Sequence, residues 1–173
     1  MRPDMRKTLV LFLICLVLSQ CGYHLRGTGS FLPEHIQEIH IPMFKNLTTR
    51  FQLDLKLTQA VIDEIVARGK VEISGDPTAA DAILVGEISS FEAIPIAFGV
   101  EATADRYNII VATKIVLRDL VSNKIIYSNP NFSYQYEYQV PEGADFESVE
   151  SEALDKLAER FARSLVITML EGF

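Results

Sequence analysis

RYNIIVATKIVLRDL, residues 106–120, is the clearest β-segment of this sequence. Side chains of a β-strand point alternately to the two faces of its sheet. One face of this stretch is mostly apolar and carries Tyr107, Ile109, Val111, Thr113, Ile115 and Leu117. The other face mixes apolar and charged residues, namely Asn108, Ile110, Ala112, Lys114, Val116 and Arg118. The alternation predicts a long β-strand with two different faces.

Further strands are predicted on both sides of this stretch. Residues 82–98 have strand character, and Pro95 restricts their far end to a sheet edge or a bend. A loop of small residues, 99–105, leads into the long strand. Residues 121–124 form a tight reversal, and a returning strand begins at Ile125. Aromatic side chains alternate along that returning strand, at Phe132, Tyr134, Tyr136 and Tyr138.

The part of the chain before residue 82 alternates between extended and helical patterns. A strand is predicted at 36–41, followed by a connecting loop at 43–49 and, after the helix, by a short strand at 70–73. Apolar residues at helical spacing predict a helix from Gln52 to Arg68. Its apolar stripe consists of Leu53, Leu57, Ala60, Val61 and Ile65.

A second, longer helix is predicted from Phe146 to Leu170, with Asp145 as its N-cap. Apolar residues recur every three or four positions and predict one buried face. That face consists of Phe146, Val149, Ala153, Leu157, Phe161, Leu165 and Met169. The order strand, helix, four strands, helix predicts an α+β fold. We expect a two-layer α/β sandwich, with two helices packed on one face of a mostly antiparallel or mixed β-sheet.

The N-terminus has the pattern of an export signal. Three basic residues, Arg2, Arg6 and Lys7, precede a ten-residue apolar run at 9–18. This run is too short to cross a bilayer as a helix, which takes roughly 20 residues. Leu18-Ser19-Gln20-Cys21 resembles a lipobox, although Gln20 is bulkier than the usual Gly or Ala. We expect cleavage before Cys21 and diacylglycerol on its sulfur. An ordinary secretory signal with an incidental cysteine is the alternative.

This reading divides the chain into three parts. Residues 1–20 are the lipoprotein signal peptide, 21–34 the lipidated N-terminus and tether, and 35–173 a single α/β sandwich domain. Cleavage removes 20 of 173 residues, including three basic and one acidic residue, and leaves 13 basic against 22 acidic residues. An acidic chain of this kind is a poor partner for nucleic acid. Because Cys21 is the one cysteine left, no disulfide is expected.

The sequence lacks the patterns that mark common enzymes. It has no G-x-S-x-G elbow, no H-E-x-x-H pair and no Walker loop. His24, His35 and His40 are too few and too scattered to form a set of metal ligands. We therefore expect a protein without catalytic activity, metal or cofactor.

Three stretches carry a family resemblance. CGYHLRG at 21–27, TADRY at 103–107 and EALDKLA at 152–158 resemble the LptE family of outer-membrane lipoproteins that assemble lipopolysaccharide. The resemblance implies a plug inside the LptD β-barrel, which helps that barrel to assemble and contacts lipopolysaccharide on its way to the cell surface. It places the protein in the cell outer membrane, lipid-anchored on the periplasmic side. The alternative function is a periplasmic lipoprotein that regulates a peptidoglycan synthase.

The resemblance also implies where lipopolysaccharide is contacted. Family members use basic side chains near the loop before the long strand and near the start of the last helix. Here Arg106 is the one basic residue of that loop, and it could pair with a lipid A phosphate. An ion pair with Asp105 or Glu101 is the alternative role. Lys114 and Arg118, with Lys124 near the hairpin, either add to a basic patch or form a solvated strand face.

The tyrosine stripe permits two interpretations. Tyr134, Tyr136 and Tyr138 could form core beneath the helices. They could also meet the wall of the partner barrel, because tyrosine is amphipathic and enriched at interfaces.

Overall fold

The described part of the chain follows the predicted order of strands and helices, with one additional short strand before the first helix. The computed structural model describes residues 32–98 and 104–171, so the signal segment, the tether and Cys21 lie outside the described residues. Within these ranges the elements are β1 (Glu38–His40), β2 (Lys45–Asn46), α2 (Leu53–Arg68), β3 (Glu72–Ser74), β4 (Ala82–Phe98), β5 (Ala104–Asp119), β6 (Ile125–Gln139) and α3 (Phe146–Glu171).

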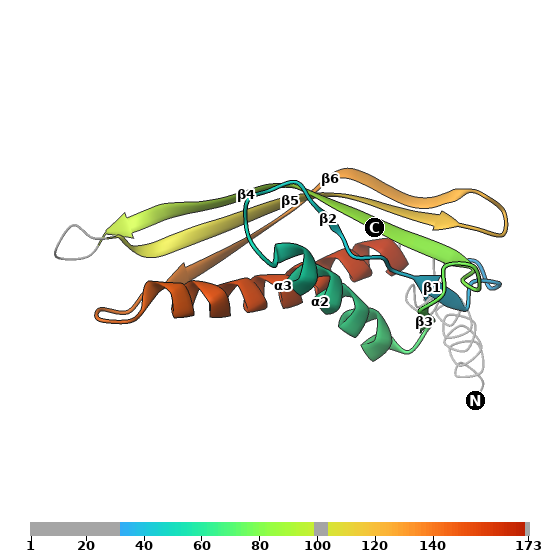
Figure 1. The fold of residues 1–173 in the computed structure, drawn as a ribbon, viewed down its shortest axis with the longest axis horizontal. Coiled ribbons are helices and arrows are strands. Elements are labelled where there is room, and N and C mark those ends of the chain that lie inside the picture. Colours follow the sequence, from blue (N-terminus) through green and yellow to red (C-terminus); the bar gives the residue numbers. More distant parts are fainter. Residues whose placement is uncertain (1–31, 99–103, 172–173) are drawn as a thin grey trace, which may run out of the picture.

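The six described strands form one open, mixed sheet in the order β3-β1-β4-β5-β6, with β2 beside β4. The three long strands β4, β5 and β6 are antiparallel, whereas β1 runs parallel to both β3 and β4. Both helices lie on the same side of this sheet, and α3 runs along its length (Figure 1). The predicted α+β sandwich is therefore confirmed.

One face of β5 is buried and the other is open, as the alternating side chains of its sequence predict. Ile109, Val111, Thr113, Ile115 and Leu117 are all fully buried beneath the helices. The side chains between them point to the uncovered face of the sheet, where Lys114 and Arg118 are exposed. A period of two along one strand thus decides which face the helices cover.

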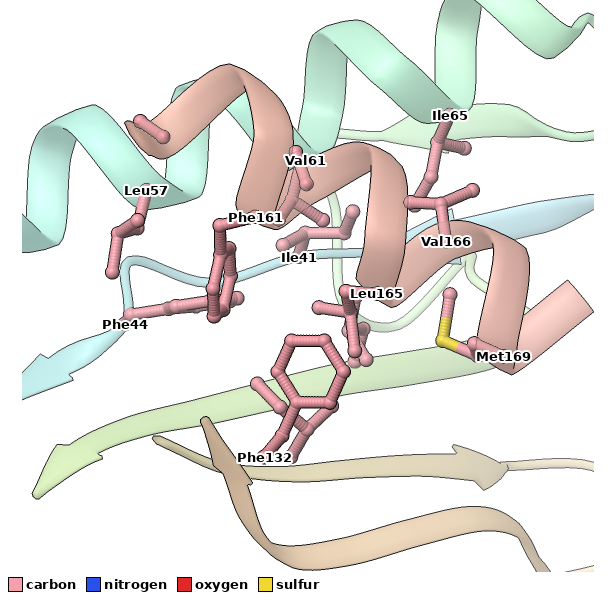
Figure 2. Packing of buried hydrophobic residues seen from close by; sticks show 14 of the residues in the cluster. Ile41, Phe44, Leu57, Val61, Ile65, Phe132, Phe161, Leu165, Val166 and Met169 are labelled. Atoms are coloured by element: carbon pink, nitrogen blue, oxygen red, sulfur yellow. The ribbon is translucent and has the colours of Figure 1, made fainter. Parts of the chain in front are cut away.

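Aromatic rings fill the space between the helices and the sheet. The ring of Phe161 on α3 is fully buried and meets Phe132 on β6 edge-on, with 5.3 Å between the ring centroids. Phe44, which precedes β2, reaches the same interior (Figure 2). Its ring lies over Gly86 on β4, where an added Cβ would come within 2.6 Å of it. Glycine at position 86 therefore lets the ring pack directly on the strand.

Most predicted boundaries agree with the structure, and the differences are local. The predicted loop at 43–49 contains β2, because Lys45 and Asn46 pair with Glu87 and Ile88 on β4. The strand predicted at 36–41 is regular only over β1. Pro95 adjoins a register shift in the β4–β5 ladder, as expected for proline in a strand.

The long helix begins where the sequence predicts. The Asp145 carboxylate accepts a hydrogen bond from the Ser148 N–H at 3.0 Å, which is the predicted cap. The predicted buried face is wrong at its first position, because Phe146 remains 42% exposed. Its ring packs edge-on against Tyr107 at the end of the sheet, so one side of the ring meets solvent. Val149 is half-buried.

Candidate functional site

The three cations predicted to bind lipopolysaccharide lie on one face of one strand. Arg106, Lys114 and Arg118 are separated by even numbers of residues along β5, so all three point to the uncovered face of the sheet. All three are exposed. Lys114 and Arg118 are four residues apart, roughly 13 Å, whereas Arg106 and Lys114 are eight apart, roughly 26 Å. Lys114 and Arg118 therefore lie nearer to each other than to Arg106, and no contact joins any two of the three side chains in the described part of the chain.

Arg106 lies near the start of β5, opposite Gln139 on β6. It borders a shallow pocket of about 230 Å³ together with Glu137, Tyr138 and Gln139. Within residues 32–98 and 104–171, Arg106 forms no ion pair, including with neighbouring Asp105. Glu101, the other predicted partner, lies outside those ranges. The Arg106 guanidinium thus faces solvent at a hollow that could admit an anionic group.

The tyrosine stripe lies on the face that the helices cover. Tyr134, Tyr136 and Tyr138 pair in register with Val111, Ile109 and Tyr107 on β5. Tyr138 is 7% exposed and stacks on Tyr107, with 5.5 Å between ring centroids. Burial, followed by the negative charge of Glu150, raises the pKa of Tyr138 to about 12, so its hydroxyl stays neutral.

Tyr134 and Tyr136 are only half-buried. The Arg160 guanidinium of α3 lies 5.0 Å from the centroid of the Tyr136 ring, in a cation–π arrangement. Tyr138 therefore belongs to the core. The exposed parts of Tyr134 and Tyr136 are what a partner could contact, and that role stays a prediction.

The sequence did not predict a buried ion pair that lies beside Tyr107 and Tyr138. The Glu150 carboxylate of α3 is nearly inaccessible, and the Arg50 Nη2 atom lies 2.8 Å from it. The same guanidinium lies 5.5 Å from the centroid of the Phe91 ring on β4. Glu150 follows Phe146 by four residues and precedes Ala153 by three, so helical spacing already places it on the apolar stripe. The place of Glu150 on this stripe was the feature of the sequence that could have predicted its burial.

A second polar cluster closes the opposite end of the sheet. Asp119 accepts hydrogen bonds from the Ser122 hydroxyl and N–H and from the Val121 N–H, and its Oδ2 atom lies 2.9 Å from His35 Nε2. These contacts, led by Ser122, lower the pKa of Asp119 to about 2. The serine hydroxyl and the imidazole both contact the carboxylate rather than each other, so this is not the arrangement of a nucleophile and its base.

The described ranges hold no group of three or more potential metal ligands. Neither described helix combines the length and the apolar character that crossing a bilayer requires. The proposed anchor, Cys21, cannot be placed because it precedes the described residues.

Comparison with known proteins adds a family and a fold. The family model described as "LptE: Lipopolysaccharide-assembly" matches residues 36–169. No curated protein sequence matches significantly.

Solved structures with a similar fold come from several bacteria. The hypothetical protein CT253 from Chlamydia trachomatis has a TM-score of 0.53 at 11% identity, covering 80% of this chain and 97% of its own. The protein XCC0632 from Xanthomonas campestris has a TM-score of 0.50 at 10% identity, covering 79% and 85%. A lipoprotein candidate from Caulobacter crescentus CB15 has a TM-score of 0.50 at 12% identity, covering 73% and 87%. At these identities the likeness shows the fold alone.

Proposed function

Because this chain belongs to the LptE family of lipopolysaccharide-assembly proteins, we propose that it plugs the LptD β-barrel of the outer membrane and helps that barrel to assemble. In this role it binds lipopolysaccharide during delivery to the cell surface and catalyses no reaction. The observation that carries the proposal is the family match, which spans all six described strands, α2 and α3 as far as Met169.

The proposed attachment is a lipid on Cys21, with the domain on the periplasmic side of the outer membrane. The basic start, the short apolar run and the lipobox-like Leu18–Cys21 support this attachment. A palmitate analogue fed to cells should label the parent protein and leave Cys21→Ala unlabelled. Label that survives on the variant would contradict the assignment and point to Cys15.

The proposed partner can be tested by isolating the lipidated protein from membranes. Purification of the full-length protein should bring down a large outer-membrane β-barrel. Depletion of the protein should leave that barrel under-assembled and the outer membrane permeable to large or hydrophobic antibiotics. Recovery of a peptidoglycan synthase in place of the barrel would favour the alternative function.

Arg106 is the proposed first contact for a lipid A phosphate, because it meets solvent beside a shallow pocket and forms no ion pair with a described residue. Arg106→Glu should weaken lipopolysaccharide binding and leave folding and barrel copurification unchanged. Binding by the parent should weaken as salt screens the charges. Arg163→Glu, on the helix layer, is the matched control. Parental affinity in Arg106→Glu would remove this residue from the site.

A further inference from the structure

The outer edge of β6 has no partner strand among the described residues. β6 is the last strand in the order of the sheet, and its 15 residues pair with β5 on one side only. Every second residue of such an edge strand directs its N–H and C=O groups away from the sheet. These groups can pair with another strand, so natural sheet edges carry features that prevent such pairing.

The other edges of the described sheet have these protective features. β3 is only three residues long and includes Glu72. The part of β4 beyond β2 contains Glu92 and Pro95, and its register with β5 shifts twice between Pro95 and Phe98. Short length, charge, proline and irregular register all oppose pairing with a further strand.

Residues 131–139 of β6 lack all of these features. They read NFSYQYEYQ, with no proline, no lysine and a single charge, at Glu137. Their register with β5 is continuous from Phe132 to Gln139. Pro130 precedes the run and ends it on that side, because proline cannot donate a backbone hydrogen bond. The unprotected edge is therefore nine residues long.

These nine residues are self-complementary about Gln135. In an antiparallel pairing of two copies centred there, Gln135 stands opposite Gln135 of the second copy. Aromatic side chains then meet aromatic ones on the side of the helices, and polar side chains meet polar ones on the open side. Cross-strand pairs of like character stabilise a sheet. The pairs, each formed twice, are Asn131–Gln139, Phe132–Tyr138, Ser133–Glu137 and Tyr134–Tyr136.

Charge and exposure along the run also suit a second copy. Glu137 stands opposite the neutral Ser133, and the Glu137 residues of the two copies lie four positions apart, roughly 13 Å. That separation exceeds the screening length of about 8 Å at physiological salt. Tyr134 and Tyr136 are half-buried in the single chain, so the pairing covers the parts of their rings that meet solvent.

We propose that the free protein associates with a second copy of itself through antiparallel pairing of residues 131–139, centred on Gln135. The two-fold axis passes between the two Gln135 residues and perpendicular to the sheet, so both sets of helices lie on the same side. One strand pair buries a small area, so the dimer forms at about micromolar or higher protein concentration. This inference goes beyond the proposed function and requires neither the barrel nor lipopolysaccharide.

Sedimentation of the full-length protein in density-matched non-ionic detergent tests the association. The parent should change from monomer to dimer as its concentration rises. Gln135→Lys should weaken the dimer about fivefold, because two lysines then stand opposite each other. Gln139→Lys is the matched control and should associate like the parent, because its lysine faces the neutral Asn131. A mixture of Gln135→Lys and Gln135→Glu should recover the parental association.

Single cysteines test the register of the pairing. Gln135→Cys should form a disulfide between two copies on mild oxidation, because directly opposite residues of an antiparallel pair have Cα atoms about 5 Å apart. Ser133→Cys should not cross-link by itself and should do so when mixed with Glu137→Cys. The parent, which keeps Cys15 or Cys21, is oxidised in parallel as the control for those residues.

The outcomes separate this dimer from the other possible occupants of the edge. A parent that stays monomeric up to about 1 mM would overturn the proposal and leave the β6 edge to a strand of a different protein. A dimer in which Gln135→Lys associates like the parent, or Ser133→Cys cross-links as readily as Gln135→Cys, would also overturn it. Thermal unfolding of each variant should match the parent, because all the substituted side chains are exposed.

Discussion

At the scale of single residues, Phe161 and Gly86 set how closely the helices approach the sheet. Phe161 is the large side chain of α3 that meets Phe132, and Gly86 is the position where Phe44 lies on the strand. Protein interiors are close-packed, so adding or removing a few atoms at such points changes stability. Both positions give sharp tests of the packing.

Phe161→Ala should lower the free energy of unfolding by about 3–5 kcal/mol, because it removes a fully buried ring and leaves a cavity. The change can be measured by urea denaturation. Arg163→Ala, two residues further along and exposed, should stay within about 0.5 kcal/mol of the parent. A parental midpoint for Phe161→Ala would show that the register of α3 is wrong.

Gly86→Ala should cost about 1–3 kcal/mol by overpacking, because its Cβ would lie 2.6 Å from the Phe44 ring. Gly75→Ala is the matched control, since no atom lies within 4 Å of a Cβ added there. Denaturation of the two variants under the same conditions makes the comparison. Equal stabilities would contradict the close contact between Phe44 and β4.

The Asp119 cluster predicts how stability depends on pH. Hydrogen bonds from Ser122 and the contact with His35 lower the pKa of Asp119 from 3.8 to about 2 in the folded state. Its contribution is therefore present above about pH 4 and lost as the pH falls toward about 2. In Asp119→Asn the decline of unfolding free energy over this interval should be shallower than in the parent. Glu142→Gln, in an exposed loop, should keep the parental slope.

At the scale of elements, the Arg50–Glu150 ion pair joins the segment before α2 to the first turns of α3. The pair lies against Phe91 and near Tyr138, beneath the end of the sheet that extends past α2. Lys56 of α2 and Asp155 of α3 form a second ion pair between these parts of the chain. The Arg50–Glu150 pair therefore ties the segment before α2 to α3 beneath Phe91 of β4.

Glu150→Ala should destabilise the protein by about 1–3 kcal/mol, because Arg50 then loses its partner in a partly desolvated place. Hydrogen exchange should rise first in the N-terminal turns of α3. Glu152→Ala, exposed on the same helix, is the matched control and should change stability little. Equal exchange in the two variants would show that the pair does not hold this end together.

At the scale of the whole molecule, one continuous core joins both helices to the sheet. We therefore expect the chain without its first 21 residues, 22–173, to unfold as one cooperative unit. Residues 22–173 contain no cysteine, so the core must supply the stability without a disulfide.

Thermal unfolding of this fragment should show a single transition that is unchanged by a chelator. The measurement is circular dichroism with and without the chelator. Two separate transitions would contradict the expectation of a single domain, and a lower midpoint with the chelator would indicate a bound metal. The full-length protein in detergent is the control for any contribution from the N-terminal segment.

The sequence alone determined the two helices, the three long strands and most of their buried faces. Apolar residues at every second position of 106–120 correctly predicted that Ile109 and Leu117 are buried. Apolar residues at every third or fourth position of the last helix did the same for Leu157 and Phe161. Such local patterns are readable because each residue's orientation follows from its neighbours in the chain. The cap at Asp145 was readable for the same reason.

Contacts between residues far apart in the sequence became visible only in the folded structure. It put β2 beside β4, joined Arg50 to Glu150 and His35 to Asp119, and turned the tyrosine stripe toward α3. It also placed the Glu87 carboxylate against Lys45 and the Arg118 guanidinium against the side chain of Asn123. Pairing across such separations depends on strand order and packing, which no local pattern encodes.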